Sequence, residues 1–372
     1  MQIETFELER NQSLYENTVK FNLTESGIHP YTLRELLTQE QQAEVLDLRL
    51  GYGQTNGAPE LRTTLASYYP GCNEDNIIVT NGSAEANFVA FWSLLEPGDE
   101  VAMMLPNYQL LYGLTRSMGC TVKPFLLRED RNWAPDLDQL ESQLSDRTKV
   151  IALCNPNNPT GSILSKQDMQ RIVALAASRD CYILSDEIYA GSELDGVETP
   201  SFIGLYDKVI VASGLAKSLS HPGLRIGWLA GPRDVIDGAW HHHDYTSISS
   251  GIISQYVANV ILQPEKRQEV LDRGRELLRT NVPIVQQWVA RHSENFRLIP
   301  PKAGGMAFIG YNIDINSSEL VSRLRKEKSV LIVAGDWFGM DNFLRLGIGG
   351  ETDELIGGLE RIDEFLGELR AG

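Results

Sequence analysis

The pattern of hydrophobic and polar residues divides the chain into three parts. In the middle part, short apolar runs alternate with longer stretches whose apolar positions recur every three or four residues. Short apolar runs are typical of buried strands, and the longer period is typical of amphipathic helices. The sequence predicts strands over 77–80, 101–105, 121–125, 149–154, 182–185 and 208–212. It predicts helices over 84–95, 109–118, 137–144 and 165–178.

The helix over 165–178 has the clearest start signal. Ser165 stands at the N-cap position and Asp168 follows three residues later, which is the spacing of a capping box. The regular alternation of strands and helices predicts the α/β class, with a mostly parallel sheet that helices cover on its faces.

The two ends of the chain have a different pattern. Residues 1–45 are polar and only weakly periodic, and a long charged helical run after residue 246 precedes a mixture of strands and helices. A chain of 372 residues is also long for one simple core. We therefore expect a large domain over 46–245 and a smaller α+β domain over 246–372, which the N-terminal segment 1–45 joins.

Charge and cysteine content narrow the possible partners and location. The net charge of −17 repels phosphate backbones and anionic membranes, so we expect neither a nucleic acid nor a membrane as partner. No uncharged apolar stretch reaches the ~20 residues that span a bilayer, and the N-terminus lacks an apolar signal region. The cysteines lack metal-site spacing and are expected to be reduced thiols of a cytoplasmic protein. They are Cys72, Cys120, Cys154 and Cys181.

Three segments carry residues that suit one cofactor. Lys217 precedes Arg225 in a Gly-rich loop, Asp186 closes an apolar run, and Asn158 precedes a Pro-Thr-Gly turn. An amine for a Schiff base, a carboxylate for a pyridine nitrogen and a donor for a ring oxygen are what pyridoxal phosphate needs. Ligands of open α/β sheets bind at the carboxyl ends of the strands, where these segments are expected. Each segment alone is also a common turn or strand end.

Together these segments resemble the class I/II aminotransferases, which are fold-type-I pyridoxal-phosphate enzymes. The resemblance extends from Tyr52 to Arg345, with the elements in the order of the family. It implies the PLP-dependent transferase fold, the cofactor pyridoxal 5'-phosphate and a homodimer with shared active sites. It also implies transfer of an amino group between an amino acid and a 2-oxo acid, with Lys217 as the Schiff-base (aldimine) lysine and general base.

The resemblance also assigns the contacts of the cofactor ring. Asp186 would pair with the pyridine nitrogen, and Tyr189 would donate to the ring oxygen beside Asn158. Tyr108 would stack on the face of the ring. Nearby cations and partial burial are expected to lower the pKa of Lys217, because the neutral amine is the nucleophile.

The contacts of the cofactor phosphate follow from the same resemblance. Ser83 and Ala84 lie where a helix begins, and free amides at such a position bind phosphate. Arg225 would add a forked contact, and Tyr52 would reach the phosphate of the neighbouring subunit. Many relatives have serines where this chain has Gly214 and Ala216. Ser213, or Tyr52 from the neighbouring subunit, would compensate for the hydroxyl that the phosphate site loses.

The expected substrate contacts come from all three parts of the chain. Arg345 would hold the substrate α-carboxylate in a bidentate pair, and Gly27 and Asn158 would make further substrate contacts. Gly27 belongs to the segment 24–31, which resembles that of cyclases of the capreomycidine synthase type. His29 in this segment could protonate a leaving hydroxyl.

Two alternatives to transamination stay open at this point. One is a β/γ-eliminating lyase or a capreomycidine-synthase-like cyclase, and the other is a non-catalytic protein that binds pyridoxal phosphate or another ligand. The run from His241 to His243 predicts no metal site, because consecutive histidines on a helix point in different directions.

Overall fold

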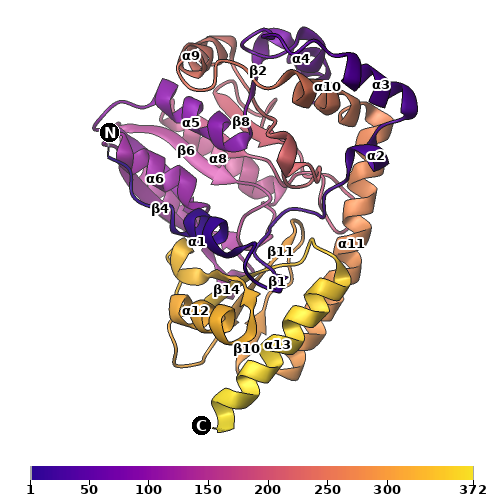
Figure 1. The fold of residues 1–372 in the computed structure, drawn as a ribbon. Helices are drawn as coiled ribbons and strands as arrows, with labels where there is room; N and C mark the ends of the chain where they lie inside the picture. The colour runs from indigo at the N-terminus through magenta and orange to yellow at the C-terminus, as the bar shows by residue number, and fades with distance from the viewer. Residues whose placement is uncertain (1, 372) are drawn as a thin grey trace.

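The computed structural model describes residues 2–371, and its largest sheet lies in the upper half of the view in Figure 1. The strand order is β2-β9-β8-β7-β6-β3-β4-β5. Their bounds are β2 Ile77–Thr80, β9 Gly227–Ala230, β8 Val209–Gly214, β7 Tyr182–Asp186, β6 Thr148–Cys154, β3 Glu100–Leu105, β4 Thr121–Arg128 and β5 Ala134–Pro135. Neighbours from β8 to β4 are parallel, whereas β9 and β5 run antiparallel to their neighbours. The mostly parallel sheet confirms the predicted α/β class.

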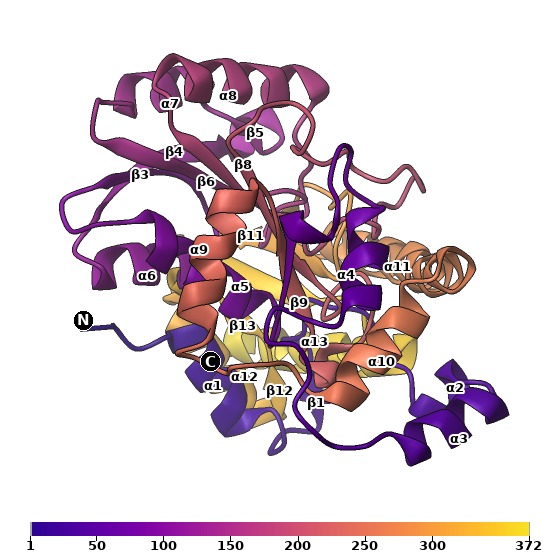
Figure 2. The same cartoon turned by 90° about the horizontal axis from the view of Figure 1, so that it is seen from above.

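Helices cover both faces of this sheet (Figure 2). One face packs against α5 (Ser83–Leu94), α6 (Gln109–Ser117) and α9 (Arg233–His243). The other face packs against α4 (Pro59–Ala66), α7 (Leu137–Gln143), α8 (Lys166–Ser178) and α10 (Ile252–Ile261). Neighbouring strand residues such as Ile77 and Ile78 belong to opposite faces, because side chains alternate along a strand. Both faces are therefore apolar, as the continuous apolar runs of the strands predict.

The strands and helices predicted between 77 and 212 are all present, with ends that differ by a few residues. The capping box of α8 is confirmed, since the Ser165 hydroxyl accepts the N–H of Asp168 and the Asp168 carboxylate accepts the N–H of Ser165. Strand β9 was not predicted. It inserts between β2 and β8 and is antiparallel to both, a position that depends on pairing with two distant segments.

A second, antiparallel sheet lies beside the C-terminal helices and has the order β10-β11-β14-β13. The bounds are β10 Phe296–Leu298, β11 Met306–Tyr311, β14 Phe343–Gly347 and β13 Val333–Ala334. It shares an apolar core with α12 (Ser317–Lys328), α13 (Thr352–Ala371) and the second half of α11 (Pro264–Arg291). The first half of α11 packs on the core of the large sheet, so this helix connects the two parts (Figure 1).

The N-terminal segment is tied to the C-terminal part by a short parallel pair, β1 (Phe21–Asn22) with β12 (Val330–Leu331). The other N-terminal elements are α1 (Glu7–Tyr15), α2 (Leu33–Leu36) and α3 (Gln39–Asp47). Short 3-10 turns occupy Glu74–Asn76, Glu129–Arg131, Pro222–Leu224 and Gly335–Phe338. The domain limits at residues 46 and 246 stay predictions.

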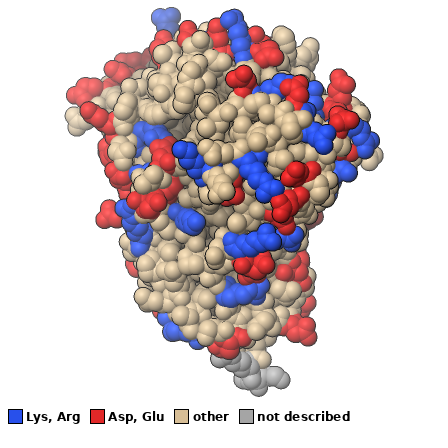
Figure 3. Space-filling view, turned by 180° about the vertical axis from the view of Figure 1, so that it is seen from behind, with Lys and Arg blue, Asp and Glu red and all other residues tan. Residues whose placement is uncertain are grey.

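The surface carries charges of both signs. On the face seen in Figure 3, acidic and basic side chains are interspersed. Within residues 2–371, no helix is both long enough and apolar enough to cross a membrane.

Candidate active site

A cavity of about 400 Å³ lies at the carboxyl ends of the parallel strands, between the large sheet and β14. Most of the predicted site residues line it: Ser83, Ala84, Tyr108, Asn158, Asp186, Tyr189, Lys217, Arg225 and Arg345. All of them except Arg345 lie at the ends of the large sheet's strands or in the segments that follow, and they meet because parallel strands end at the same sheet edge. Arg345 belongs to β14 of the second sheet.

One end of the cavity is suited to an anion. Helix α5 begins at Ser83 without a side-chain cap, so its first backbone N–H groups have no capping partner. Arg225 lies over this helix start, since a Cβ on Gly82 would be 2.2 Å from its Nη2 atom. Free amides, the helix dipole and a guanidinium together favour a phosphate group at this end.

A buried carboxylate forms part of the cavity wall. Asp186 ends β7, and its carboxylate accepts the Ile188 N–H at 3.2 Å and the Asn87 side-chain N–H at 3.0 Å. Burial raises the pKa of Asp186 to about 6. Sequence reasoning missed Asn87, although it lies one helical turn after Ser83 and so shares its face of α5.

The second sheet contributes a buried guanidinium. Arg345 is 1% exposed, and it donates from Nη1 to Oδ1 of Asn158 at 3.0 Å and from Nη2 to the Thr24 carbonyl at 2.8 Å. Its Nε atom has no partner among the described residues. Burial lowers the pKa of Arg345 from its usual value, although nearby Tyr189 and Glu25 oppose this. A buried cation with an unused donor is suited to a carboxylate ligand.

Lys217 is held by a residue that the sequence analysis did not assign. Its Nζ atom is 2.6 Å from Oε1 of Glu25 in the N-terminal segment. Burial would lower the pKa of Lys217, but the Glu25 carboxylate and Tyr189 outweigh it and the pKa is raised. The predicted lowering of this pKa is therefore wrong for the protein without cofactor. The only sequence signal for Glu25 was its place in the segment 24–31.

The N-terminal helix covers one side of the cavity. The Tyr108 hydroxyl donates a short hydrogen bond to the Glu9 carboxylate, and the Phe6 and Tyr108 rings are 4.8 Å apart. Burial and Glu9 raise the pKa of Tyr108 well above its usual value. Elsewhere in the lining, the Tyr189 hydroxyl is 2.9 Å from Oγ of Ser26, and burial raises the pKa of Tyr189 to about 12.

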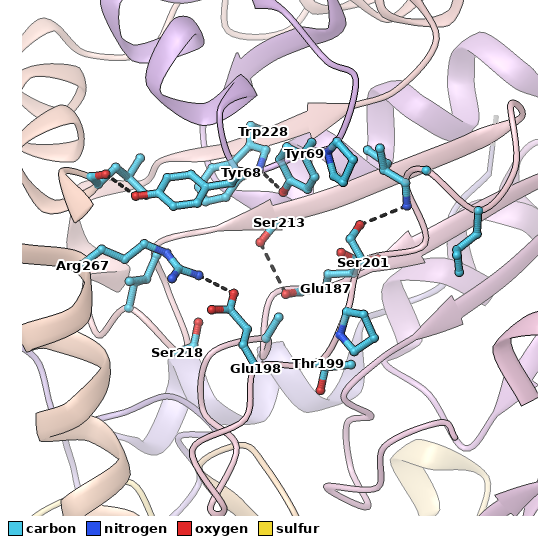
Figure 4. A pocket seen from close by; sticks show the side chains of 18 residues that line it. Tyr68, Tyr69, Glu187, Glu198, Thr199, Ser201, Ser213, Ser218, Trp228 and Arg267 are labelled. Atoms are coloured by element: carbon cyan, nitrogen blue, oxygen red, sulfur yellow. Dashed lines mark hydrogen bonds and ion pairs between the residues drawn. The ribbon is translucent and has the colours of Figure 1, made fainter. Parts of the chain in front are cut away.

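Three predicted contacts do not line this cavity. Ser213 lines a different cavity of about 570 Å³, where its hydroxyl donates to the Glu187 carbonyl at 3.5 Å (Figure 4). Tyr52 is 88% exposed. Gly27 lies under the lysine loop, where a Cβ would be 2.9 Å from the Ala216 carbonyl oxygen. A direct contact of Ser213 with a ligand in this cavity thus finds no support, whereas the contact of Tyr52 with the site of a neighbouring subunit stays a prediction.

The histidines singled out in the sequence lie elsewhere. His29 is 3.2 Å from Glu351 and does not line the cavity, so its role as a proton donor to a leaving hydroxyl finds no support in this geometry. His243 is buried at the end of α9, 3.3 Å from Glu85. Among residues 2–371, no group of three or more His, Cys, Asp or Glu side chains could hold a metal ion.

The cavity fits pyridoxal phosphate in its donor and acceptor groups. It offers an uncapped helix start with Arg225 for the phosphate, a buried Asp186 carboxylate for the ring nitrogen and the Lys217 amine for the aldehyde. Oδ1 of Asn87 also lacks a partner in the described part of the chain, so the wall keeps unused polar atoms.

Comparisons with known proteins agree with this geometry. The family model for aminotransferase class I and II matches residues 19–362. Capreomycidine synthase from Streptomyces vinaceus is 30% identical over 357 residues, which cover 95% of this chain and 91% of that protein. An aspartate aminotransferase from Thermotoga maritima is 28% identical, covering 85% of this chain and 83% of its own length. A PLP-dependent aminotransferase from Streptococcus suis has a similar crystal structure, with a TM-score of 0.92, 33% identity and 99% of each chain covered.

Proposed function

This chain belongs to the class I and II aminotransferase family, and we propose that it transfers an amino group from an amino acid to a 2-oxo acid with Lys217 as the reactive amine. One observation carries the assignment of residues: Lys217, Asp186 and Arg345 line one cavity, beside the uncapped start of α5. Each of these groups serves a different part of the cofactor and substrate.

The proposed roles follow from the position of each group. When bound, pyridoxal phosphate supplies an aldehyde for the amine and an electron-accepting ring. The free amides of Ser83 and Ala84 hold its phosphate with Arg225, and Asp186 keeps a positive charge on the ring nitrogen.

The substrate is oriented by the second sheet. Arg345 holds the α-carboxylate, which fixes the substrate so that the Cα–H bond faces Lys217. Lys217 then takes the Cα proton and returns it on the cofactor side. Tyr108 and the N-terminal helix cover the cavity and limit the access of water.

We further propose a homodimer, because the segment from Leu46 to Tyr52 and the end of α9 expose large apolar side chains. Leu46, Leu50, Tyr52 and Tyr245 are each more than three quarters exposed. The chain just after Tyr52 meets α9, since the Trp240 indole donates to Thr55 at 2.6 Å. Large exposed apolar groups of this kind typically mark an interface. A partner subunit that covers the segment from Leu46 to Tyr52 would bring Tyr52 towards the neighbouring site.

We also propose a cytoplasmic location, and this proposal rests on the state of the cysteines. Cys72, Cys120, Cys154 and Cys181 are all free thiols. Reduced thiols of this number are typical of proteins in reducing compartments.

A panel of amino acids given to the holoenzyme without an oxo acid tests the reaction type. Transamination predicts stoichiometric formation of pyridoxamine phosphate, measured by chromatography, after which the reaction stops. Continuous release of ammonia or of a cyclised product would instead support the elimination or cyclase alternative, which the relative named capreomycidine synthase keeps in view. Failure of every amino acid to react would contradict both enzymatic proposals.

A further inference from the structure

A carboxylate with no role in the proposed function lies against the reactive amine. Oε1 of Glu25 is 2.6 Å from Nζ of Lys217, and the same oxygen accepts the Gly27 N–H at 2.8 Å. We propose that Glu25 is the charge partner of Lys217: it stabilises the protonated amine and sets the strength of Lys217 as a base. The inference rests on the proposed role of Lys217 and adds a reactive-site residue from outside the large sheet.

The backbone beside Glu25 is fixed from both sides. The carbonyl of Thr24 accepts a hydrogen bond from Nη2 of Arg345 at 2.8 Å. On the other side, Oγ of Ser26 is 2.9 Å from the hydroxyl of Tyr189. The carboxylate is thus carried by a segment that hydrogen bonds to two other walls of the cavity, and its position is set by the fold.

The approach of this segment to the lysine loop depends on a glycine. A Cβ at Gly27 would lie 2.9 Å from the Ala216 carbonyl oxygen and 3.4 Å from Cδ of Lys217. A larger residue would push the segment away from Lys217 and lengthen the ion pair. The Glu25 side chain itself is 51% exposed because it faces the open cavity.

The other ionisable groups around Lys217 do not replace Glu25. Tyr189 keeps its proton near neutral pH, because burial raises its pKa to about 12. Asp186 is already bound by Ile188 and Asn87 and is assigned to the ring nitrogen. Arg345 is a cation and opposes a second positive charge. Among the described residues, Glu25 is the anion in direct contact with the amine.

The contact has a defined effect on proton transfer. The Cα–H bond breaks, its proton moves to Nζ of Lys217, and its electron pair stays with the substrate, where the ring of a bound cofactor would accept it. The ammonium group that forms lies within contact of the Glu25 carboxylate, and an opposite charge at this distance favours the charged form. Glu25 therefore makes Lys217 a stronger base for this step.

Competitive acetylation of the full-length protein, stripped of cofactor, measures the Lys217 amine directly. The labelling of Lys217 is followed by mass spectrometry across pH, since only the neutral amine reacts. Glu25→Gln should move the midpoint to lower pH and raise the labelling rate below it roughly tenfold, the factor that one pKa unit represents. Glu25→Asp keeps the negative charge, so its labelling midpoint should lie between that of the wild-type protein and that of Glu25→Gln. Glu16→Gln is the matched control, because Glu16 is exposed at the end of α1 and should leave the midpoint unchanged.

The pH profile of kcat in the holoenzyme gives the second measurement. Glu25→Gln should move the acidic limb to lower pH and lower the plateau about tenfold. A merely structural role would lower the plateau without moving the limb, and that result overturns the proposal. If added cofactor does not protect Lys217 from acetylation, the proposed function itself fails. Protection combined with an unchanged Lys217 midpoint in Glu25→Gln overturns this inference alone.

Discussion

At the scale of single residues, the site depends on charged groups that the fold buries. Asp186 and Arg345 are both nearly inaccessible, and burial disfavours the charged form of each, raising the pKa of the carboxyl and lowering that of the guanidinium. A buried charge is costly unless a partner compensates it. The cofactor and the substrate carboxylate are the proposed partners, so binding should relieve part of this cost.

Replacement of Arg345 by lysine should weaken catalysis strongly. Arg345→Lys keeps the positive charge but loses the fork that grips a carboxylate and the donor to Asn158. We expect the fall in kcat/KM to correspond to a loss of about 1.5–3 kcal/mol of transition-state stabilisation, the range for a hydrogen bond to a charged group. Steady-state kinetics measure the change, and Arg291→Lys on the exposed end of α11 is the control. An unchanged kcat/KM would remove Arg345 from the substrate site.

At the scale of secondary-structure elements, the start of α5 is the feature on which phosphate binding is proposed to depend. The helix follows β2 through Gly82, which has φ of +85° and lies directly under the Arg225 guanidinium. Strand β9 brings Arg225 to this point, because Gly227 pairs with Thr80 beside the helix start. A positive φ and a close neighbour both require glycine at this position.

A side chain at Gly82 should therefore weaken cofactor binding. In Gly82→Ala the new Cβ would be 2.2 Å from Nη2 of Arg225, so the guanidinium must move away from the helix start. We expect the Kd for pyridoxal phosphate to rise at least roughly tenfold, the scale of one charged hydrogen bond. Equilibrium dialysis measures it. Gly223→Ala is the matched control, since its Cβ would meet nothing within 4 Å. Equal affinity of the two variants would contradict the proposed phosphate site.

At the scale of the whole molecule, the proposed dimer completes the site. Tyr52 is 88% exposed and does not line the cavity of its own chain, and the exposed Leu50 stands two residues before it. Its proposed role therefore requires a second copy.

Mixed dimers test this shared site. Tyr52→Phe and Lys217→Ala subunits, each impaired alone, are unfolded and refolded together in equal amounts. Random pairing gives heterodimers with one intact site, so activity should recover to roughly a quarter of the wild-type value. Activity no higher than the sum of the separate variants would contradict sharing. So would a fully active monomer in light scattering, or a Tyr52→Phe homodimer with wild-type activity.

Much of the fold and site was predictable because its signals are local. The alternation of apolar runs and helical periods gave the strands and helices between residues 77 and 212. The resemblance to a family then selected Lys217, Asp186, Asn158 and Arg345, and all four line one cavity. The capping box at Ser165 needed only two residues of sequence.

Only the tertiary structure decided the features that join distant segments. Three examples depend on pairings between distant segments that no local pattern contains. They are strand β9, the contact of Asn87 with Asp186, and the position of Ser213 in a different cavity. The charge of Lys217 is the sharpest case, since the sequence predicted a lowered pKa and the structure raises it through Glu25. A pKa reports the summed field of the groups in space, and Glu25 is far from Lys217 along the chain. Sequence fixes which groups exist and their local conformation, whereas the packing of the N-terminal segment on the sheet determines which charges meet.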